Sequence, residues 1–256
     1  MMRERHGKGL GMLRPAILLF LALIALTGPA TAEPKKKAPL VAPAERSVSL
    51  EIVLAVDGSA SITDGGLEFQ LQGHAAAFND PQLGESISAG GIAATLVVFS
   101  GPHSLRVIVP WTVLRNAEDA KAFAHKIESA PRGIQADSTA LGSAIDDSAK
   151  LFENNGINAP RKVIDIVSNG FNNSGADPAG ARDRAERKGI TINALAILDE
   201  FSWLEEYYQE NIVGGPNCFV KTAMDRDSFV EALRQKLIQE IAGLGVPAKI
   251  ITAANL

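Results

Sequence analysis

Apolar runs alternate with amphipathic segments along most of the chain, and this alternation constrains the fold more than any other feature. The apolar runs that predict buried strands are Ser49–Val56, Ile92–Phe99, Val163–Val167, Ile190–Leu198 and Phe219–Ala223. Apolar residues three or four positions apart predict helices at Leu67–Phe78, Asn116–Ser129, Thr139–Phe152, Pro178–Lys188 and Asp227–Ile241. Strands that alternate with helices form parallel sheets covered on both faces. We therefore expect an α/β domain built on a doubly wound sheet.

One further strand departs from the parallel pattern. The apolar segment Leu105–Val109 follows the strand Ile92–Phe99 after only the short turn Ser100–Ser104. A parallel crossover connection needs about a dozen residues or more, so these two strands should pair antiparallel. The sequence thus predicts a mostly parallel sheet with one antiparallel edge strand.

The first 32 residues have the features of a secretory signal peptide. Basic residues precede the apolar run Ala16–Thr27, and Ala30-Thr31-Ala32 forms a small-residue cleavage site. The apolar run is shorter than the roughly 20 residues that a membrane span requires. We expect cleavage before Glu33 and an exported protein, periplasmic or secreted, whose mature chain has no transmembrane span.

The remaining chain divides into a linker, one domain and a tail. Residues 33–46 are rich in proline and lysine and predict an extended linker. The domain should cover residues 47–243, and residues 244–256 form a C-terminal tail. The whole chain carries a formal net charge of −4, and the predicted signal peptide holds more basic than acidic residues. An acidic mature protein argues against nucleic acid as a partner.

The segment Asp57-Gly58-Ser59-Ala60-Ser61 directly follows the first predicted strand. It places a carboxylate and two hydroxyls at every second position of the turn that leaves the strand. Open α/β sheets bind ligands just outside the carboxyl ends of their strands. Hard divalent cations prefer oxygen donors of this kind.

Two other segments carry polar residues at comparable places. Asp137-Ser138-Thr139 opens a predicted helix, where Ser138 or Thr139 could simply cap the helix. Ser168-Asn169-Gly170 follows the strand Val163–Val167. Both segments should reach the same edge of a parallel sheet as Asp57.

These three segments resemble the three loops of the metal-ion-dependent adhesion site of von Willebrand factor A domains, whose first loop has the pattern D-x-S-x-S. The resemblance implies a set of metal ligands, namely Asp57, Ser59, Ser61, Thr139 and Asn169. It also implies that Mg²⁺ binds there, with Ca²⁺ or Mn²⁺ as alternatives, and that a protein or envelope ligand offers a carboxylate to the open coordination position.

The third loop departs from the family pattern, because Asn169 stands where the family has aspartate. A carboxylate about 4 Å from a divalent cation gains roughly 8 kcal/mol of Coulomb energy at an effective dielectric constant near 20, much of it offset by desolvation. Asn169 retains an oxygen and lacks that charge, so we expect weak metal binding. Asp165 lies too far along the strand to replace it. We expect Asp165 to be buried and satisfied by the backbone or by an arginine.

Three further stretches resemble a bacterial exported family, a von Willebrand A-like group known as domain of unknown function 1194. They are Arg106–Thr112, Gly189–Ile197 and Ile212–Val220. The resemblance covers roughly residues 48–242. It implies the von Willebrand A fold and a Mg²⁺ or Ca²⁺ site, and it implies no reaction.

We therefore expect a binding module and not an enzyme. The chain has no nucleotide-binding glycine motif and no G-x-S-x-G nucleophile motif. Two alternatives stay open. One is a scaffold whose degenerate site binds a partner without metal. The other is a metal-dependent hydrolase, which would need a general base that the three loop segments do not supply.

Overall fold

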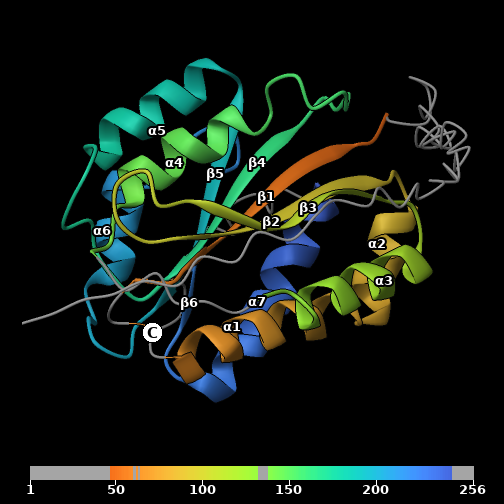
Figure 1. The fold of residues 1–256 in the computed structure, drawn as a ribbon, viewed down its shortest axis with the longest axis horizontal. Helices are drawn as coiled ribbons and strands as arrows, with labels where there is room; N and C mark the ends of the chain where they lie inside the picture. The colour runs from red at the N-terminus through yellow and green to blue at the C-terminus, as the bar shows by residue number, and fades with distance from the viewer. Residues whose placement is uncertain (1–46, 60–61, 63, 132–137, 244–256) are drawn as a thin grey trace, which may run out of the picture. The chain divides into compact units, whose positions relative to one another are not determined.

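The computed structural model of this protein describes residues 47–59, 62, 64–131 and 138–243. The predicted signal peptide, linker and tail lie outside these residues, as do Ser61 and Asp137. The described chain forms one six-stranded sheet with the strand order β3-β2-β1-β4-β5-β6 (Figure 1).

The sheet is parallel except at one edge. Its strands are β1 (Leu50–Asp57), β2 (Ile92–Phe99), β3 (Arg106–Leu114), β4 (Lys162–Ser168), β5 (Ile190–Ile197) and β6 (Val220–Ala223). The central strand β1 pairs in parallel with β2 and β4, while the edge strand β3 pairs antiparallel with β2. The predicted fold class, an α/β domain with one antiparallel edge strand, is confirmed.

Helices cover both faces of the sheet (Figure 1). One layer holds α1 (Asp64–Phe78), α2 (Pro81–Ser88), α3 (Ala117–Glu128) and α7 (Arg226–Ile241), and the other holds α4 (Leu141–Lys150), α5 (Pro178–Arg187) and α6 (Leu204–Asn211). Alternate residues of β1 serve the two layers, since Ile52 and Leu54 join one core and Val53 and Ala55 join the other. The period of two along a strand therefore explains why this run is apolar at every position.

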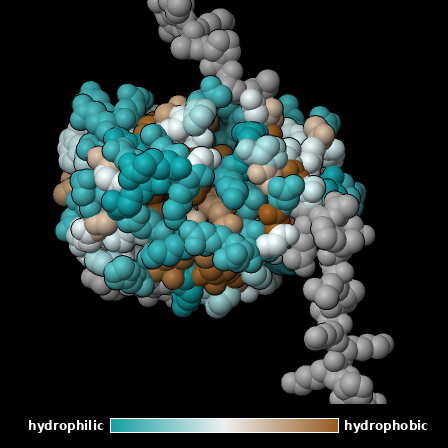
Figure 2. All heavy atoms as spheres, turned by 90° about the horizontal axis from the view of Figure 1, so that it is seen from above, coloured by the Kyte–Doolittle hydropathy of each residue, from teal (hydrophilic) through white to brown (hydrophobic). Residues whose placement is uncertain are grey.

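The face of the molecule seen in Figure 2 is mostly hydrophilic. Seen from above the view of Figure 1, hydrophobic residues gather only in patches between polar ones (Figure 2). Three large hydrophobic side chains are clearly exposed in the described chain, namely Val107, Trp203 and Met224. Two of these, Trp203 and Met224, belong to loops that follow strands at the carboxyl edge of the sheet.

The structure differs from the sequence-based expectation at several boundaries. Helices α2 and α6 were not predicted, and α2 begins directly after Asp80, whose side chain accepts from Gln82 N at 2.8 Å. The Asp80-Pro81 pair thus ends one helix and starts the next. Strand β3 extends through Pro110, which an edge strand tolerates because one side of it needs no partner.

The domain has two distinct poles. At the carboxyl edge lie the ends of β1, β4, β5 and β6 together with the loops that follow them. At the opposite edge the described chain begins, with Ser47 bridged to Asn158. The described chain also ends at this edge, just after α7, where a Cβ on Gly243 would lie 3.0 Å from Arg161 Nη1. The described residues of the polar segments therefore lie at the pole opposite Ser47 and Gly243.

Candidate metal site at the carboxyl edge

Asp57 is the last residue of β1, and its side chain is fully buried. Its Oδ1 accepts a hydrogen bond of 2.8 Å from Ser59 N, which fixes the turn that leaves the strand. Gly58 between them donates from N to Phe99 O at 2.8 Å, and a Cβ at this glycine would lie 2.6 Å from Val98 Cγ1. Glycine is therefore required for the turn to lie this close to β2.

Thr139 lies just before α4 and completes a hydroxyl pair with Ser59. Its Oγ1 donates to Ser59 Oγ at 2.9 Å, and both side chains are almost fully buried. Two reciprocal bonds hold the Thr139 backbone, because Thr139 N donates to Asn173 Oδ1 at 2.9 Å and Asn173 N donates to Thr139 O at 2.9 Å. The structure thus brings Asp57 and Ser59 of the first loop together with Thr139 of the second.

Ser168, the last residue of β4, also reaches Asp57, and sequence reasoning missed it. Its Oγ donates to Asp57 Oδ2 at 2.5 Å and accepts from Gly170 N at 3.0 Å. The signal was present, because β4 was predicted to lie in the parallel sheet and Ser168 directly follows its apolar run.

Asn169 follows Ser168 at the same edge and is 3% exposed. It lines a groove together with Ile62 and Gln70. Ser61, the remaining predicted ligand, lies outside the described residues. The alternative in which Ser138 or Thr139 caps α4 is wrong, since the N-cap position is Ala140 and no side chain caps it. Asn172 Oδ1 accepts from Gly142 N instead, at 3.2 Å.

The electrostatics of Asp57 are unusual for a buried carboxylate. Burial raises the pKa of the Asp57 carboxyl above its usual range, and hydrogen bonds from Ser168 and Ser59 only partly oppose this effect. Within the described residues, no lysine, arginine or histidine contributes a compensating charge to it. A buried carboxylate without a positive partner is costly, so this position favours either a proton or a cation.

The donors at this edge are all oxygens, which suits a hard divalent cation. In the described part of the chain, no group of three or more histidine, cysteine, aspartate or glutamate side chains could hold a metal ion. The candidate ligands are therefore one carboxylate, Asp57, and the hydroxyls of Ser59 and Thr139. A set of this composition fits Mg²⁺, which commonly keeps several waters and takes only one or two carboxylates.

An aromatic cluster flanks this edge, and sequence reasoning did not predict it. Phe171, from the loop after β4, packs against Phe201 and Trp203 with ring centroids 5.4 and 5.6 Å apart. Behind them, Tyr208 donates its hydroxyl to Gly170 O at 2.7 Å, and Tyr207 OH accepts from Asn172 N at 3.2 Å. Helix α6 thereby holds the loop that follows Asn169.

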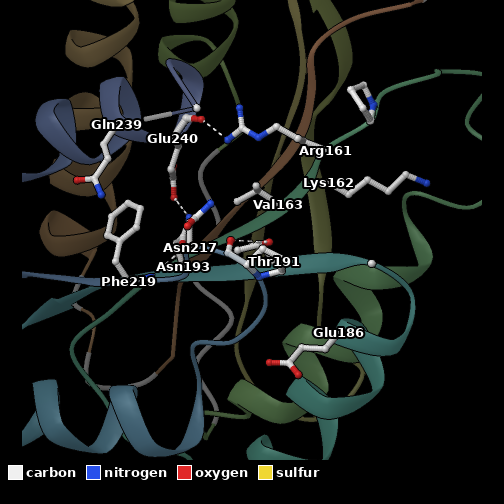
Figure 3. Close-up of a pocket in the computed structure, with 14 residues that line it drawn as sticks. Arg161, Lys162, Val163, Glu186, Thr191, Asn193, Asn217, Phe219, Gln239 and Glu240 are labelled. Atoms are coloured by element: carbon white, nitrogen blue, oxygen red, sulfur yellow. Dashed lines mark hydrogen bonds between the residues drawn. The ribbon is translucent and has the colours of Figure 1, made fainter. Parts of the chain in front are cut away.

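A second buried polar cluster lies toward the opposite pole. Lys236 of α7 forms ion pairs with Asp165 of β4 and with Glu240, the latter at 2.7 Å. Asn193 Nδ2 also donates to Glu240 Oε1, at 2.8 Å (Figure 3). The expectation that an arginine or the backbone satisfies Asp165 is wrong, because a lysine from the last helix does so. Sequence pattern alone did not place Lys236 on the buried face of α7.

Burial shifts the pKa values of two groups in this second cluster. Burial and the neighbouring Asp165 carboxylate raise the pKa of Glu240 to about 8, against the lowering effect of Lys236. Burial also lowers the pKa of His74, which lies in α1 close enough to interact with both Asp165 and Lys236. The raised pKa favours the protonated form of Glu240 more than in an exposed glutamate.

A family comparison assigns the domain. The profile of a family described as "Protein of unknown function (DUF1194)" matches residues 47–245. The chain belongs to this family. The match to DUF1194 covers all the described strands and helices. No curated protein matches the chain.

Solved structures show that this DUF1194 domain has the von Willebrand factor A fold. One similar structure is the von Willebrand domain of the type V pili tip protein Mfa5 from Porphyromonas gingivalis, with 12% identity and a TM-score of 0.52 over 76% of this chain and 95% of that one. Another is the proximal thread matrix protein 1 of the mussel byssus, with a zinc-occupied adhesion-site motif. It is 20% identical with a TM-score of 0.57 over 77% of this chain.

A third similar structure is the pilus adhesin SpaC from Lactobacillus rhamnosus GG in an open conformation, with 16% identity and a TM-score of 0.50 over 76% of this chain. This chain spans 30% of the adhesin and 48% of the mussel protein. SpaC is a pilus adhesin, Mfa5 a pili tip protein and the mussel protein a thread matrix protein. Within the described residues, no helix has both the length and the apolar character to cross a membrane.

Proposed function

We propose that this protein is an exported binding module that recognises a protein or envelope ligand through a divalent cation at the carboxyl edge of its sheet. The observation that carries the proposal is the convergence on Asp57 of hydroxyl groups from separate loops, without a basic side chain to balance its charge. Asp57, Ser59 and Thr139 would bind the ion, and Ser61 and Asn169 would complete the set. A carboxylate of the ligand would take the open position.

Mg²⁺ is the proposed ion, with Ca²⁺ and Mn²⁺ as alternatives that take the same oxygen donors. Binding should be weak because Asn169 brings no charge. The zinc-occupied adhesion-site motif of the mussel protein and the similarity to the pilus adhesin SpaC support the proposal.

A second candidate is a scaffold that binds its partner without metal. One observation favours it, because both carboxylate oxygens of Asp57 already accept hydrogen bonds from Ser59 and Ser168. These bonds give the carboxylate partial compensation without an ion.

Titration of the purified full chain with Mg²⁺, Ca²⁺ and Mn²⁺ by calorimetry separates the two candidates. Saturable binding that Asp57→Ala abolishes supports the metal-dependent module. A pull-down from envelope extract, run with and without chelator, extends the test to the ligand. The proposal is contradicted if the chain captures the same ligand with and without chelator and calorimetry shows no heat of metal binding. That result favours the scaffold.

Export is part of the same proposal. Removal of residues 1–32 would leave Glu33 as the first residue of an envelope or secreted protein, with residues 33–46 as its linker. Mass spectrometry of the protein from cell fractions tests this. An intact amino terminus in the membrane fraction, or an unprocessed protein in the cytoplasm, would count against it.

A further inference from the structure

A groove opens beside the candidate metal site. It has a volume of about 550 Å³ and lies between α1 on one side and the ends of β5 and β6 on the other. Asn169 lines it, so the groove is continuous with the edge that carries Asp57. Its described lining combines apolar side chains, three carboxylates and the amide side chains of Gln70 and Asn169.

The walls of the groove are apolar. Phe69 of α1 and Phe229 of α7 pack against each other with ring centroids 5.1 Å apart. Ile62 and Ile197 add aliphatic surface, and Met224 is 63% exposed at the mouth. An exposed methionine beside a groove is an adaptable apolar contact for a side chain that enters it.

The rim of the groove is acidic. Asp199 and Glu200 follow β5 and are exposed, and Asp225 caps the N-terminus of α7. Hydrogen bonds from Ser228 lower the pKa of Asp225, so this carboxylate stays ionised. None of the described lining residues is basic. The rim therefore attracts a cation and repels an anionic group.

The lining also includes an unsatisfied acceptor, the side-chain oxygen of Gln70. Gln70 is 1% exposed, and its Nε2 donates to Asp57 O at 3.3 Å. Its Oε1 is buried and has no hydrogen-bond partner among the described residues. A buried amide oxygen without a donor is unfavourable, so a group that enters the groove with an N–H gains by reaching it.

We propose that the groove receives a lysine or arginine side chain of the same ligand that offers its carboxylate to the metal. The aliphatic stem packs between Phe69 and Met224, and the cationic head reaches Gln70 Oε1 and the acidic rim. This inference rests on the proposed function, since it places a cationic side chain of the ligand next to its metal-binding carboxylate. A purely apolar side chain would leave Gln70 Oε1 unpaired, and an acidic one would face three carboxylates.

Two small probes test the groove in the full chain. Butylguanidinium and butylurea share the same stem and a planar head of similar shape, and they differ in charge. We expect butylguanidinium to shift the amide resonances of Gly66, Gln70 and Met224 in nuclear magnetic resonance spectra. It should bind about fivefold more tightly than butylurea, the ratio that a surface ion pair of ordinary strength provides.

The double variant Asp199→Asn and Glu200→Gln should weaken butylguanidinium binding about fivefold and leave butylurea unaffected. Glu85→Gln removes an exposed acid from α2, away from the groove, and serves as the control with unchanged binding. Equal affinity for the two probes overturns the proposal, as does a double variant that binds like the parent chain or shifts that map to another surface.

The probe titrations are run in chelator, so they do not depend on a bound ion. If the protein binds Mg²⁺ and does not bind butylguanidinium, the proposed function stands and the proposal for the groove is refuted. If the protein binds butylguanidinium at the groove and binds no divalent cation, the proposed metal site is refuted. The groove then still accepts a cationic side chain.

Discussion

Thr139 and Ser59 lie 80 residues apart in sequence, yet their hydroxyl oxygens are 2.9 Å apart. If both hydroxyls bind the ion, Thr139→Val should remove the stabilisation that Mg²⁺ gives to the folded protein. The variant itself should lose about 1 kcal/mol of unfolding free energy, the usual worth of one buried hydrogen bond. Urea unfolding with and without Mg²⁺ measures both effects.

Thr95→Val is the matched control for this test. Thr95 is equally buried, and its Oγ1 donates to Val109 O at 2.7 Å, away from the candidate site. It should cost a similar free energy and keep the full response to Mg²⁺. A Mg²⁺ response that survives in Thr139→Val would remove Thr139 from the ligand set.

Asp57→Asn should raise the unfolding free energy of the metal-free protein at pH 7. Burial raises the pKa of Asp57, so the folded state loses stability as pH rises from the unfolded pKa through the folded one. The amide removes this loss and keeps an oxygen for Ser59 N. The same variant should show no stabilisation by Mg²⁺.

Thermal and urea unfolding in chelator measure the change for Asp57→Asn. Glu206→Gln removes the same charge from an exposed side chain on α6 and should stay within about 0.5 kcal/mol of the parent chain. A stability gain of equal size in both variants would assign the effect to net charge and not to the burial of Asp57.

Asn169→Asp should tighten Mg²⁺ binding by about tenfold or more, because it places a second carboxylate beside the ion. The Coulomb energy gained is large before the cost of desolvation is subtracted. A tenfold increase in affinity requires that about 1.4 kcal/mol of this energy remains. Calorimetry gives the affinity directly. Asn172→Asp adds the same charge to the same loop, where Asn172 Oδ1 faces Gly142 N. Equal tightening in both variants would indicate a general field effect without ligation by residue 169.

The stability of the protein should fall as pH rises between about 4.5 and 8. The pKa of Glu240 is raised to about 8 in the folded state from 4.5, so in this window the unfolded chain releases a proton that the folded chain keeps. The slope from this one group is at most about 1.4 kcal/mol per pH unit. Glu240→Gln should flatten the decline, as followed by urea unfolding at several pH values.

Glu231→Gln on the same helix tests the sign of this effect. Hydrogen bonds from Arg234 and Gln235 lower the pKa of Glu231 to about 2, so its contribution is present above pH 4.5 and is lost on acidification. The variant should keep the decline between pH 4.5 and 8 and alter only the acid limb. An unchanged decline in Glu240→Gln would contradict the assignment of this pH dependence to Glu240.

The sequence was sufficient for the sheet because the strand signal is carried by single contiguous runs. Ile52 to Val56 is apolar at every position, and the structure divides these residues between two cores. The antiparallel partner of β2 followed from one short turn. Helix α6 was missed because Glu205, Glu206 and the tyrosines beside them give little apolar periodicity, and its burial rests on Leu204 and Tyr208.

The sequence predicted only those residues of the candidate site that match a motif. Asp57 is placed by the end of a parallel strand, whereas Thr139 lies just before α4 and was matched only through its motif position. The bonds of Ser168 to Asp57 and of Asn173 to Thr139 depend on the path of the loop after β4, which local sequence pattern does not encode. Lys236 was missed for the same reason, since its burial depends on which face of α7 meets β4 and α1.

Ser47 and Gly243 lie at one pole of the domain, and Asp57 lies at the other. The described domain therefore joins the rest of the chain, at Ser47 and at Gly243, on the pole opposite the candidate site. A pulling force between the two ends would enter at β1 and leave through α7, at the edge where Arg161 reaches both the last turn of α7 and the start of β4. The mechanical load would fall on that edge, so the loops that hold Asp57 and Thr139 would keep their geometry under tension.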